Sequence, residues 1–234
     1  MSSIHSDAPA QRLRSILAGA TSMTLRTTDQ RAELVGRHRL DGHGQVRIDL
    51  PADSRLAADI TRQGEVTAII ELTDLVPTPV RDRVRGRGTL SGWLTPAALG
   101  EAGPVGDLRV VLDLANAEFS ADGVSATIDP AAFAAAEPDP LAADEADLLC
   151  HLDRHHPRTI ERLFRLIDPH HRYGVQRVVP VRLDRHGLVL RLERVRGHRD
   201  VRLGFATTLR HQDELGRSMA ALLANSAGCP HRLR

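Results

Sequence analysis

Lysine is absent from this chain of 234 residues, so all 31 basic side chains are arginine. The absence excludes every function that needs a lysine amine, including Schiff-base catalysis, P-loop phosphate binding and the catalytic lysine of protein kinases. Any site for a phosphate or a carboxylate must therefore use arginine, whose planar guanidinium suits both groups.

Cysteine and aromatic residues are also scarce. The two cysteines, Cys150 and Cys229, are too few to build a disulfide framework. Aromatic residues make up only 3% of the chain, so it offers no evident stacking platform for single-stranded nucleic acid. The net charge is +1, which gives no bulk attraction for a polyanion. We therefore expect no nucleic-acid partner.

Long hydrophobic runs are missing as well. No apolar stretch is long enough to cross a bilayer, and no charged-then-apolar signal peptide opens the chain. The composition, 41% hydrophobic and 26% charged, is that of a globular protein with one large domain or two small ones. We expect a cytoplasmic protein with no membrane partner.

The first half of the chain is rich in alternating hydrophobic patterns that predict β-strands. A helix is predicted over 8–19, and a second one lies between a capping Ser54 and a terminating Gly64. The turn DGHG (41–44) predicts a hairpin. The predicted strands cover 21–28, 32–40, 45–50, 66–76, 80–94, 108–120 and 123–129. Six or seven strands with two short helices indicate a small barrel or sandwich.

A stretch rich in alanine, proline and aspartate, residues 130–147, marks a domain boundary. We predict a barrel domain over 8–130, a linker over 131–143, an α+β domain over 144–226 and a tail over 227–234.

The second domain is predicted to contain a helix, three strands and a final helix. The apolar residues of its first helix keep helical spacing on both sides of Pro157. At this proline the helix either kinks or ends, and a second helix begins. Two strands pair around the turn DRHG (184–187), a third strand covers 201–206, and the last helix runs from about 211 to 225. The overall fold class is α+β.

The sequence HLDRHH (151–156) holds three histidines and an aspartate within six residues. The spacing places His151 and His155 on or beside the buried face of the helix, as i,i+4 neighbours. Such a pair can bind a metal, but without the glutamate of HExxH the pattern predicts no metal centre. The alternative is a pair of core-edge histidines bonded to backbone carbonyls.

The stretch VRDRVRGRG (80–88) places Arg81, Arg83, Arg85 and Arg87 at every second position. In a strand these four guanidiniums would share one face, which must be solvated, paired with acids or occupied by an anion. The glycines in and after this stretch let another group approach closely or permit a bulge; they are Gly86, Gly88 and Gly92. The alternative is an ordinary solvated or subunit-interface face.

The tail SAGCPHRLR (226–234) carries a Cys-Pro dipeptide followed by His231. Imidazole and thiolate are both haem ligands. The alternative is a frayed terminus without a role.

The order of these motifs resembles a known two-domain arrangement. The segment EADLLCHLDRHHPRTIERLF (145–164), the DRHG hairpin, RDVRLGF (199–205) and DELGRSMAALLA (213–224) resemble a C-terminal domain of unknown function with a His-Met-Asn-x-Asp-His signature. That domain follows an FMN-binding-type split barrel in the haem-utilisation and haem-degrading (HugZ-like) family and in the glutamyl-tRNA reductase-binding proteins. Two positions depart from the signature, Asp153 and His155.

The resemblance implies a degenerate FMN-binding-type split β-barrel, related to pyridoxamine 5'-phosphate oxidases, followed by a small α+β domain. It implies a homodimer and a haem-binding protein of haem utilisation or tetrapyrrole regulation. His151 or His156, with His231, would be the iron ligands, and Arg83 and Arg85 would face the propionates.

Two alternatives of other classes stay open. One is an FMN-dependent oxidoreductase in which Arg83 and Arg85 hold the phosphate. The other is a cofactor-free regulatory module that binds a tetrapyrrole-pathway enzyme. No catalytic residue is predicted on any of the three hypotheses.

Overall fold

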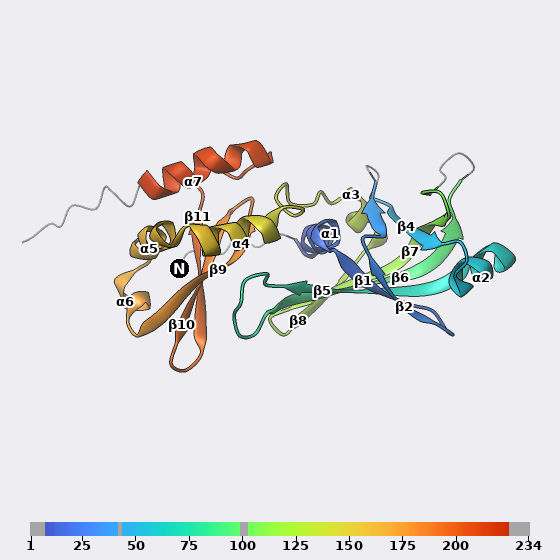
Figure 1. The fold of residues 1–234 in the computed structure, drawn as a ribbon, viewed down its shortest axis with the longest axis horizontal. Helices are drawn as coiled ribbons and strands as arrows, with labels where there is room; N and C mark the ends of the chain where they lie inside the picture. The colour runs from blue at the N-terminus through green and yellow to red at the C-terminus, as the bar shows by residue number, and fades with distance from the viewer. Residues whose placement is uncertain (1–7, 42–43, 99–102, 225–234) are drawn as a thin grey trace, which may run out of the picture. The chain divides into compact units, whose positions relative to one another are not determined.

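The structure of the chain is a computed structural model that describes residues 8–41, 44–98 and 103–224. The described residues form two compact units, each with its own hydrophobic core. Most helices and strands of both units are labelled in Figure 1.

The two units are not simple halves of the chain. The barrel unit consists of Asp7–Leu75 and Val84–Pro138, and the C-terminal unit takes Val76–Arg83 together with Asp139–Arg234. The segment 76–83, which connects two neighbouring strands of the barrel, therefore belongs to the other unit.

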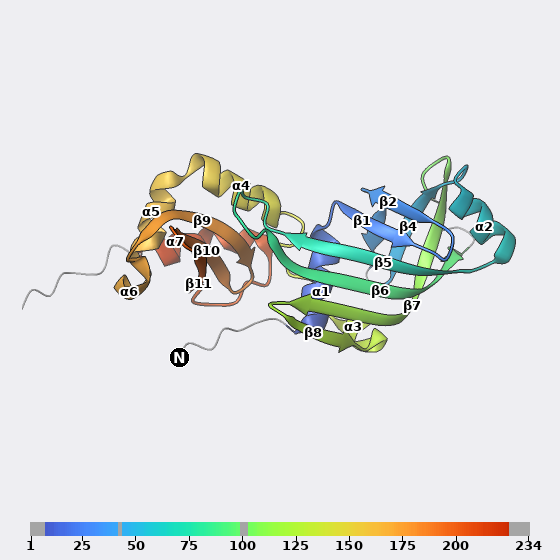
Figure 2. The same cartoon turned by 90° about the horizontal axis from the view of Figure 1, so that it is seen from below.

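The barrel unit is one curled antiparallel sheet with three helices. In chain order its elements are α1 (Pro9–Gly19), β1 (Ser22–Arg26), β2 (Arg31–Val35), β3 (His38–Leu40), β4 (Val46–Pro51), α2 (Arg55–Gln63), β5 (Val66–Leu75), β6 (Val84–Pro96), β7 (Asp107–Ala121), β8 (Val124–Ile128) and α3 (Pro130–Ala135). The strand order is β2-β1-β5-β6-β7-β4-β3, and β8 also pairs with β7 (Figure 2). The predicted fold class, a split barrel followed by a small α+β domain, is confirmed.

The long strand β7 allows the sheet to curl. One edge of β7 pairs with β6, whereas its other edge pairs with β4 along its first half and with β8 along its second half. Side chains alternate between the two faces, so that Ile70 and Leu72 are buried while Ile69 and Thr73 are exposed. The apolar inner face closes over α1, whose Leu13 is fully buried.

Glycines on β6 make room for this packing. A Cβ atom at Gly88 would clash with Cδ1 of Leu13. A Cβ at Gly92 would clash with the carbonyl of Asp113, at the point where the register between β6 and β7 shifts. Both predicted roles of these glycines, close approach and a bulge, are confirmed.

Local sequence signals fix several boundaries in the barrel unit. The hydroxyl of Ser54 accepts a hydrogen bond from the N–H of Ala57 at 3.2 Å, and α2 ends at Gly64 with φ at +83°. The predicted hairpin around 41–44 joins β3 and β4. The strand predicted over 32–40 is instead two strands, because Gly36 turns the chain with φ at +64°.

The C-terminal unit packs helices on a three-stranded antiparallel sheet. Its elements are α4 (Glu145–His155), α5 (Pro157–Arg165), α6 (Pro169–Arg172), β9 (Val175–Asp184), β10 (Gly187–Arg194), β11 (His198–Gly204), the 3-10 turn η1 (Gln212–Glu214) and α7 (Leu215–Ala224). The strand order is β11-β10-β9. Leucines of β10 form its core with Leu149 of α4, Leu163 of α5 and Leu222 of α7.

The segment 76–83 is bound to this sheet. Thr78 is only 1% exposed, and its hydroxyl donates a hydrogen bond to the carbonyl of Pro180 at 2.8 Å. Pro180 lies in β9, an edge strand, where a missing backbone N–H is tolerated. This bond joins residues 102 positions apart in the sequence.

Arg191 of β10 holds the far end of the same segment. Its Nη1 atom donates to the carbonyl of Arg81 at 2.8 Å and to that of Asp82 at 3.0 Å. Its Nε and Nη2 atoms bind the two carboxylate oxygens of Asp200, both at 2.8 Å. Hydrogen bonds to Asp200 raise the pKa of Arg191 against the opposing effect of burial.

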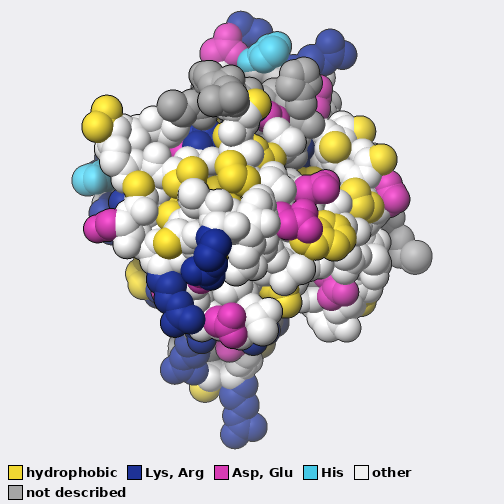
Figure 3. Space-filling model, turned by 90° about the vertical axis from the view of Figure 1, so that its right-hand side faces the viewer, with side chains coloured by type: hydrophobic (Ala, Val, Ile, Leu, Met, Phe, Trp, Pro, Cys, Tyr) yellow, Lys and Arg dark blue, Asp and Glu magenta, His cyan; other side chains and the backbone are white. Residues whose placement is uncertain are grey.

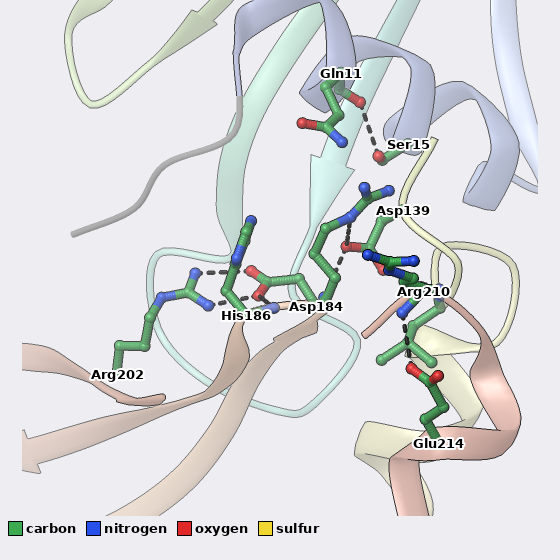
Figure 4. Close-up of polar contacts among 10 residues, drawn as sticks. Gln11, Ser15, Asp139, Asp184, His186, Arg202, Arg210 and Glu214 are labelled. Atoms are coloured by element: carbon green, nitrogen blue, oxygen red, sulfur yellow. Dashed lines mark hydrogen bonds and ion pairs between the residues drawn. The ribbon is translucent and has the colours of Figure 1, made fainter. Parts of the chain in front are cut away.

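The hairpin turn between β9 and β10 is held by two carboxylates (Figure 4). Asp184 binds the guanidinium of Arg202 through both oxygens, at 2.5 and 2.7 Å, and also accepts a hydrogen bond from the N–H of His186 at 3.0 Å. Asp139 accepts from the backbone N–H of Arg185 at 2.8 Å. Burial alone would raise the pKa of Asp184, but the Arg202 and His186 bonds outweigh it and lower that pKa.

Within the described residues, no helix is both long enough and apolar enough to span a bilayer.

Candidate functional site

The junction between α4 and α5 gathers three histidines. The last hydrogen bond of α4 runs from the N–H of His156 to the carbonyl of Leu152 at 3.1 Å. Pro157 then starts α5 as its first residue, since its missing N–H is not needed there. Of the two alternatives for Pro157, a second helix is therefore correct.

This turn brings His156 back against α4. Nε2 of His156 lies 3.0 Å from Nε2 of His151. The ring centroids of these two residues are 4.9 Å apart, and those of His151 and His155 are 5.1 Å apart. One imidazole of the closest pair donates a hydrogen bond and the other accepts it. We call these three residues the histidine cluster.

The prediction that His151 and His155 lie at the buried face is wrong, because all three histidines of the cluster are exposed. The buried stripe of α4 is centred on Leu149, which is 0% exposed. At about 100° per residue, His151 and His155 point roughly 200° and 240° away from Leu149. The alternative, in which His151 and His155 are core-edge histidines bonded to backbone carbonyls, is also wrong, because both are exposed and Nε2 of His151 contacts His156 instead.

The arginine-rich stretch does not form one continuous strand. β6 begins only at Val84, and Asp82 takes a left-handed conformation with φ at 53°. Arg81 and Arg83 therefore lie in the segment bound to the C-terminal unit, and only Arg85 and Arg87 alternate along β6. The prediction of four guanidiniums on one strand face is wrong.

Arg85 already has an anionic partner. Its Nε lies 2.9 Å and its Nη2 lies 2.5 Å from Oδ1 of Asp74 on the neighbouring strand β5. Both side chains are largely buried, with 11% and 12% of their surfaces exposed. A phosphate or propionate would have to displace Asp74 to bind this guanidinium.

Arg83 is more available. Its Nε donates to the carbonyl of Val76 at 2.9 Å, and the residue is exposed. The terminal nitrogens of a guanidinium held in this way can still reach an anion. Arg83 and the histidine cluster belong to the same compact unit, whereas Arg85 belongs to the barrel unit.

His231 and Cys229 lie outside the described residues, so their predicted role stays a prediction. Cys150, next to the histidine cluster, is a free cysteine of intermediate exposure. Among the residues that the structure does describe, no group of three or more His, Cys, Asp or Glu side chains is arranged to hold a metal ion.

The histidine cluster fits a haem iron better than a bare metal ion. Iron in haem already has four nitrogen ligands in the macrocycle, so one or two imidazoles suffice. His151 and His156 are exposed, and a flat macrocycle can reach them. Two exposed arginines lie close to these histidines in the sequence, Arg154 between His151 and His155 and Arg158 just after His156, and both could pair with propionates.

Comparison with known proteins supports the fold. No protein-family model matches the chain, and no curated protein matches its sequence. A haem-binding protein from Mycobacterium smegmatis is similar in structure, with a TM-score of 0.64 and 19% identity. The similarity covers 97% of this chain and 100% of that one. The two proteins share one fold. At 19% identity the similarity shows a shared fold and does not by itself assign a ligand to this chain.

A second solved structure is a protein of unknown function from Agrobacterium tumefaciens. It is 14% identical, with a TM-score of 0.39 over 89% of this chain and 92% of that one. This score is too low to support an inference.

Sequence patterns did not predict the segment 76–83 as part of the C-terminal unit. Its contacts with Pro180 and Arg191 join positions about a hundred residues apart, and no local pattern reports such contacts. The available signal was Pro77 and Pro79, because a proline cannot donate to a strand ladder and so indicates that the strands are interrupted here.

Proposed function

We propose that this protein binds haem, with His151 or His156 as an iron ligand. The observation that carries the proposal is the exposed imidazole pair with its two Nε2 atoms 3.0 Å apart. An exposed imidazole nitrogen whose present partner is another imidazole can exchange that partner for iron without exposing a buried polar group. The shared fold with a haem-binding protein of similar length supports the proposal.

The residues around the pair suit the rest of a haem. Arg154 lies between His151 and His155 in the sequence, Arg158 follows His156, and both are exposed, as is Arg83. Guanidinium groups bind carboxylates in two-pronged pairs, so these arginines are the proposed propionate partners. Arg85 is less suited to bind a propionate, because its guanidinium is already paired with Asp74.

Haem, when bound, supplies an iron that can exchange electrons or bind a small ligand. The protein residues would bind and orient it. His231 stays the proposed second ligand. On this proposal the protein acts in haem utilisation or in regulating tetrapyrrole supply, as a homodimer of split barrels.

The FMN alternative is weaker in this structure. It requires arginines that are ready to hold a phosphate, and Arg85 is paired with Asp74 while Arg83 lies in another compact unit. A cofactor-free module that binds a tetrapyrrole-pathway enzyme is the remaining alternative, and it makes no use of the histidine cluster.

A haemin titration followed by absorbance tests the proposal. We expect a saturable, shifted Soret band at one haem per chain, which the double variant H151A/H156A loses. His170→Ala removes an exposed histidine of α6 outside the cluster and should leave the band unchanged. An unshifted haemin spectrum, or a shift that survives the double variant, would overturn the assignment. Flavin absorbance in the untreated protein would favour FMN.

A further inference from the structure

A pocket of about 240 Å³ opens on the barrel unit. None of its lining residues belongs to the histidine cluster. Its walls come from the turn between β1 and β2, the end of α2, the first residues of β5 and one residue of β6. Four separate segments of one compact unit thus meet at a single hollow. Figure 3 looks at the end of the molecule that carries α2 and shows acidic side chains beside hydrophobic ones on this face.

Hydrogen bonds hold the walls in place. The amide Nε2 of Gln30 donates to Oδ2 of Asp59 at 2.8 Å, which ties the β1–β2 turn to α2. Within the turn, the N–H of Gln30 donates to the hydroxyl of Thr27 at 3.2 Å. A site whose walls are fixed in advance loses little entropy when a ligand enters.

The lining is acidic. It includes the carboxylates of Asp29, Asp59 and Glu65, and no arginine is among the lining residues. Asp59 is paired with Arg62 beside the pocket. In the described part of the chain, Asp29 and Glu65 form no ion pair, and both are exposed. The pocket therefore presents unneutralised negative charge.

Trp93 forms the apolar part of the wall. It is the single tryptophan of the chain, and 39% of its surface is exposed. It lies on the outer face of β6, opposite Thr67 of β5. The face of an indole ring attracts organic cations more strongly than the face of any other aromatic side chain does. Carboxylates and a partly exposed indole together recognise a cation that also has apolar surface.

We propose that this pocket binds a small organic cation with an ammonium or guanidinium group. The cation would lie against Trp93 with its charge toward Asp29 and Glu65. The amides of Gln30 and Gln63, both in the lining, would accept its remaining hydrogen bonds. The volume lies just below the range of typical small-molecule sites, which limits the ligand to a small molecule. This proposal is independent of haem binding.

The single tryptophan makes the test direct. We would titrate the haem-free protein with agmatine, which carries both an ammonium and a guanidinium group, and follow Trp93 fluorescence and the heat of binding. We expect saturable binding of one agmatine per chain with a Kd on the order of 1 mM, weakened by added salt. Pentanol, which has apolar surface but no charge, should not bind.

Variants distinguish this pocket from general attraction to acidic surface. The double variant D29N/E65Q should weaken agmatine binding at least about tenfold. Asp122→Asn is the matched control, because Asp122 is an exposed carboxylate of the same unit with φ at 53°, a conformation that asparagine adopts easily. Circular dichroism would confirm that all variants are folded.

Three results would overturn the proposal. The first is the absence of a saturable signal with agmatine. The second is that pentanol binds as tightly as agmatine. The third is that D29N/E65Q leaves the affinity for agmatine unchanged, or that Asp122→Asn lowers it as much as D29N/E65Q does.

Discussion

Nε2 of His151 lies 3.0 Å from Nε2 of His156 on the surface of the C-terminal unit. Only one of these two nitrogens can carry a proton in that contact, so the other presents a lone pair. An iron atom needs that lone pair, and it must replace the hydrogen bond between the two rings in order to bind.

The two single variants should therefore differ in haem binding. The variant that removes the iron ligand, H151A or H156A, is expected to lose the Soret shift. The other variant removes only a competing hydrogen bond and should bind haemin as tightly as the unmodified protein or more tightly. Haemin titrations of both variants, with H155A beside them, would identify the ligand. Equal retention of the shift in all three would contradict a role for the cluster.

Replacing Arg191 with alanine should destabilise the C-terminal unit. The change removes a two-pronged ion pair with Asp200 and leaves the carbonyls of Arg81 and Asp82 without their donor. Because the Arg191 side chain is only 7% exposed, we expect a loss of about 2–4 kcal/mol in the free energy of unfolding.

Urea unfolding followed by circular dichroism would measure this loss. Arg199→Ala is the control, since Arg199 is an exposed arginine of β11. A change below about 0.5 kcal/mol for that control is expected. If Arg191→Ala unfolds at the same urea concentration as the control, the segment 76–83 is not held as described.

Asp184 should make the stability of the C-terminal unit dependent on pH. Its pKa is lowered in the folded state, so the stabilisation is present above the unfolded value near 3.8 and is lost as pH falls through the folded pKa. Asp184→Asn should therefore cost about 1–3 kcal/mol at neutral pH and less at an acidic pH below the folded pKa of Asp184.

Urea unfolding at the two pH values would test the difference. The exposed Asp213, replaced by asparagine, provides the control. A destabilisation by Asp184→Asn that is equally large at both pH values would show that the ion pair with Arg202 is not its origin.

Gly88→Ala should loosen the barrel core. The added Cβ would clash with Cδ1 of the buried Leu13, and we expect a loss of about 1–3 kcal/mol. Adding Leu13→Ala to Gly88→Ala should remove the clash, so the two changes together should cost less than the sum of their separate effects.

The control for this experiment is Gly216→Ala. Gly216 lies in the first turn of α7 with nothing near its Cβ position, so alanine there should stabilise or leave stability unchanged. Thermal melts of the four variants, Gly88→Ala, Leu13→Ala, the double variant and Gly216→Ala, would decide the point. Equal melting temperatures for Gly88→Ala and the unmodified protein would contradict the packing described for β6.

Much of the fold could be predicted because its signals are local. Ser54 and Gly64 bound α2 through a cap and a left-handed residue, both of which depend on neighbours within four positions. Alternation along β9 and β10 predicted their buried faces for the same reason.

The candidate site was harder to predict. The orientation of His151 depends on whether Leu148 or Leu149 is the centre of the buried stripe, and a shift of one residue turns the helix by about 100°. Both residues are leucines, so the sequence pattern does not distinguish them. The packing of α4 on the rest of its unit decides which of the two is buried. The start of β6 at Val84 was missed because distant residues, Pro180 and Arg191, bind the segment before it.

The placement of residues 76–83 affects how the chain can be divided into separate domains. A single cut in the chain near Asp139 would separate most of the C-terminal unit from residues 76–83. These residues belong to that unit but would stay with the barrel fragment, between β5 and β6. Neither unit is therefore one continuous stretch of sequence. A different barrel hairpin in this chain would have to supply a hydroxyl for the carbonyl of Pro180 and carbonyls for the guanidinium of Arg191, so a change in the barrel's own loop would alter the sheet of the C-terminal unit.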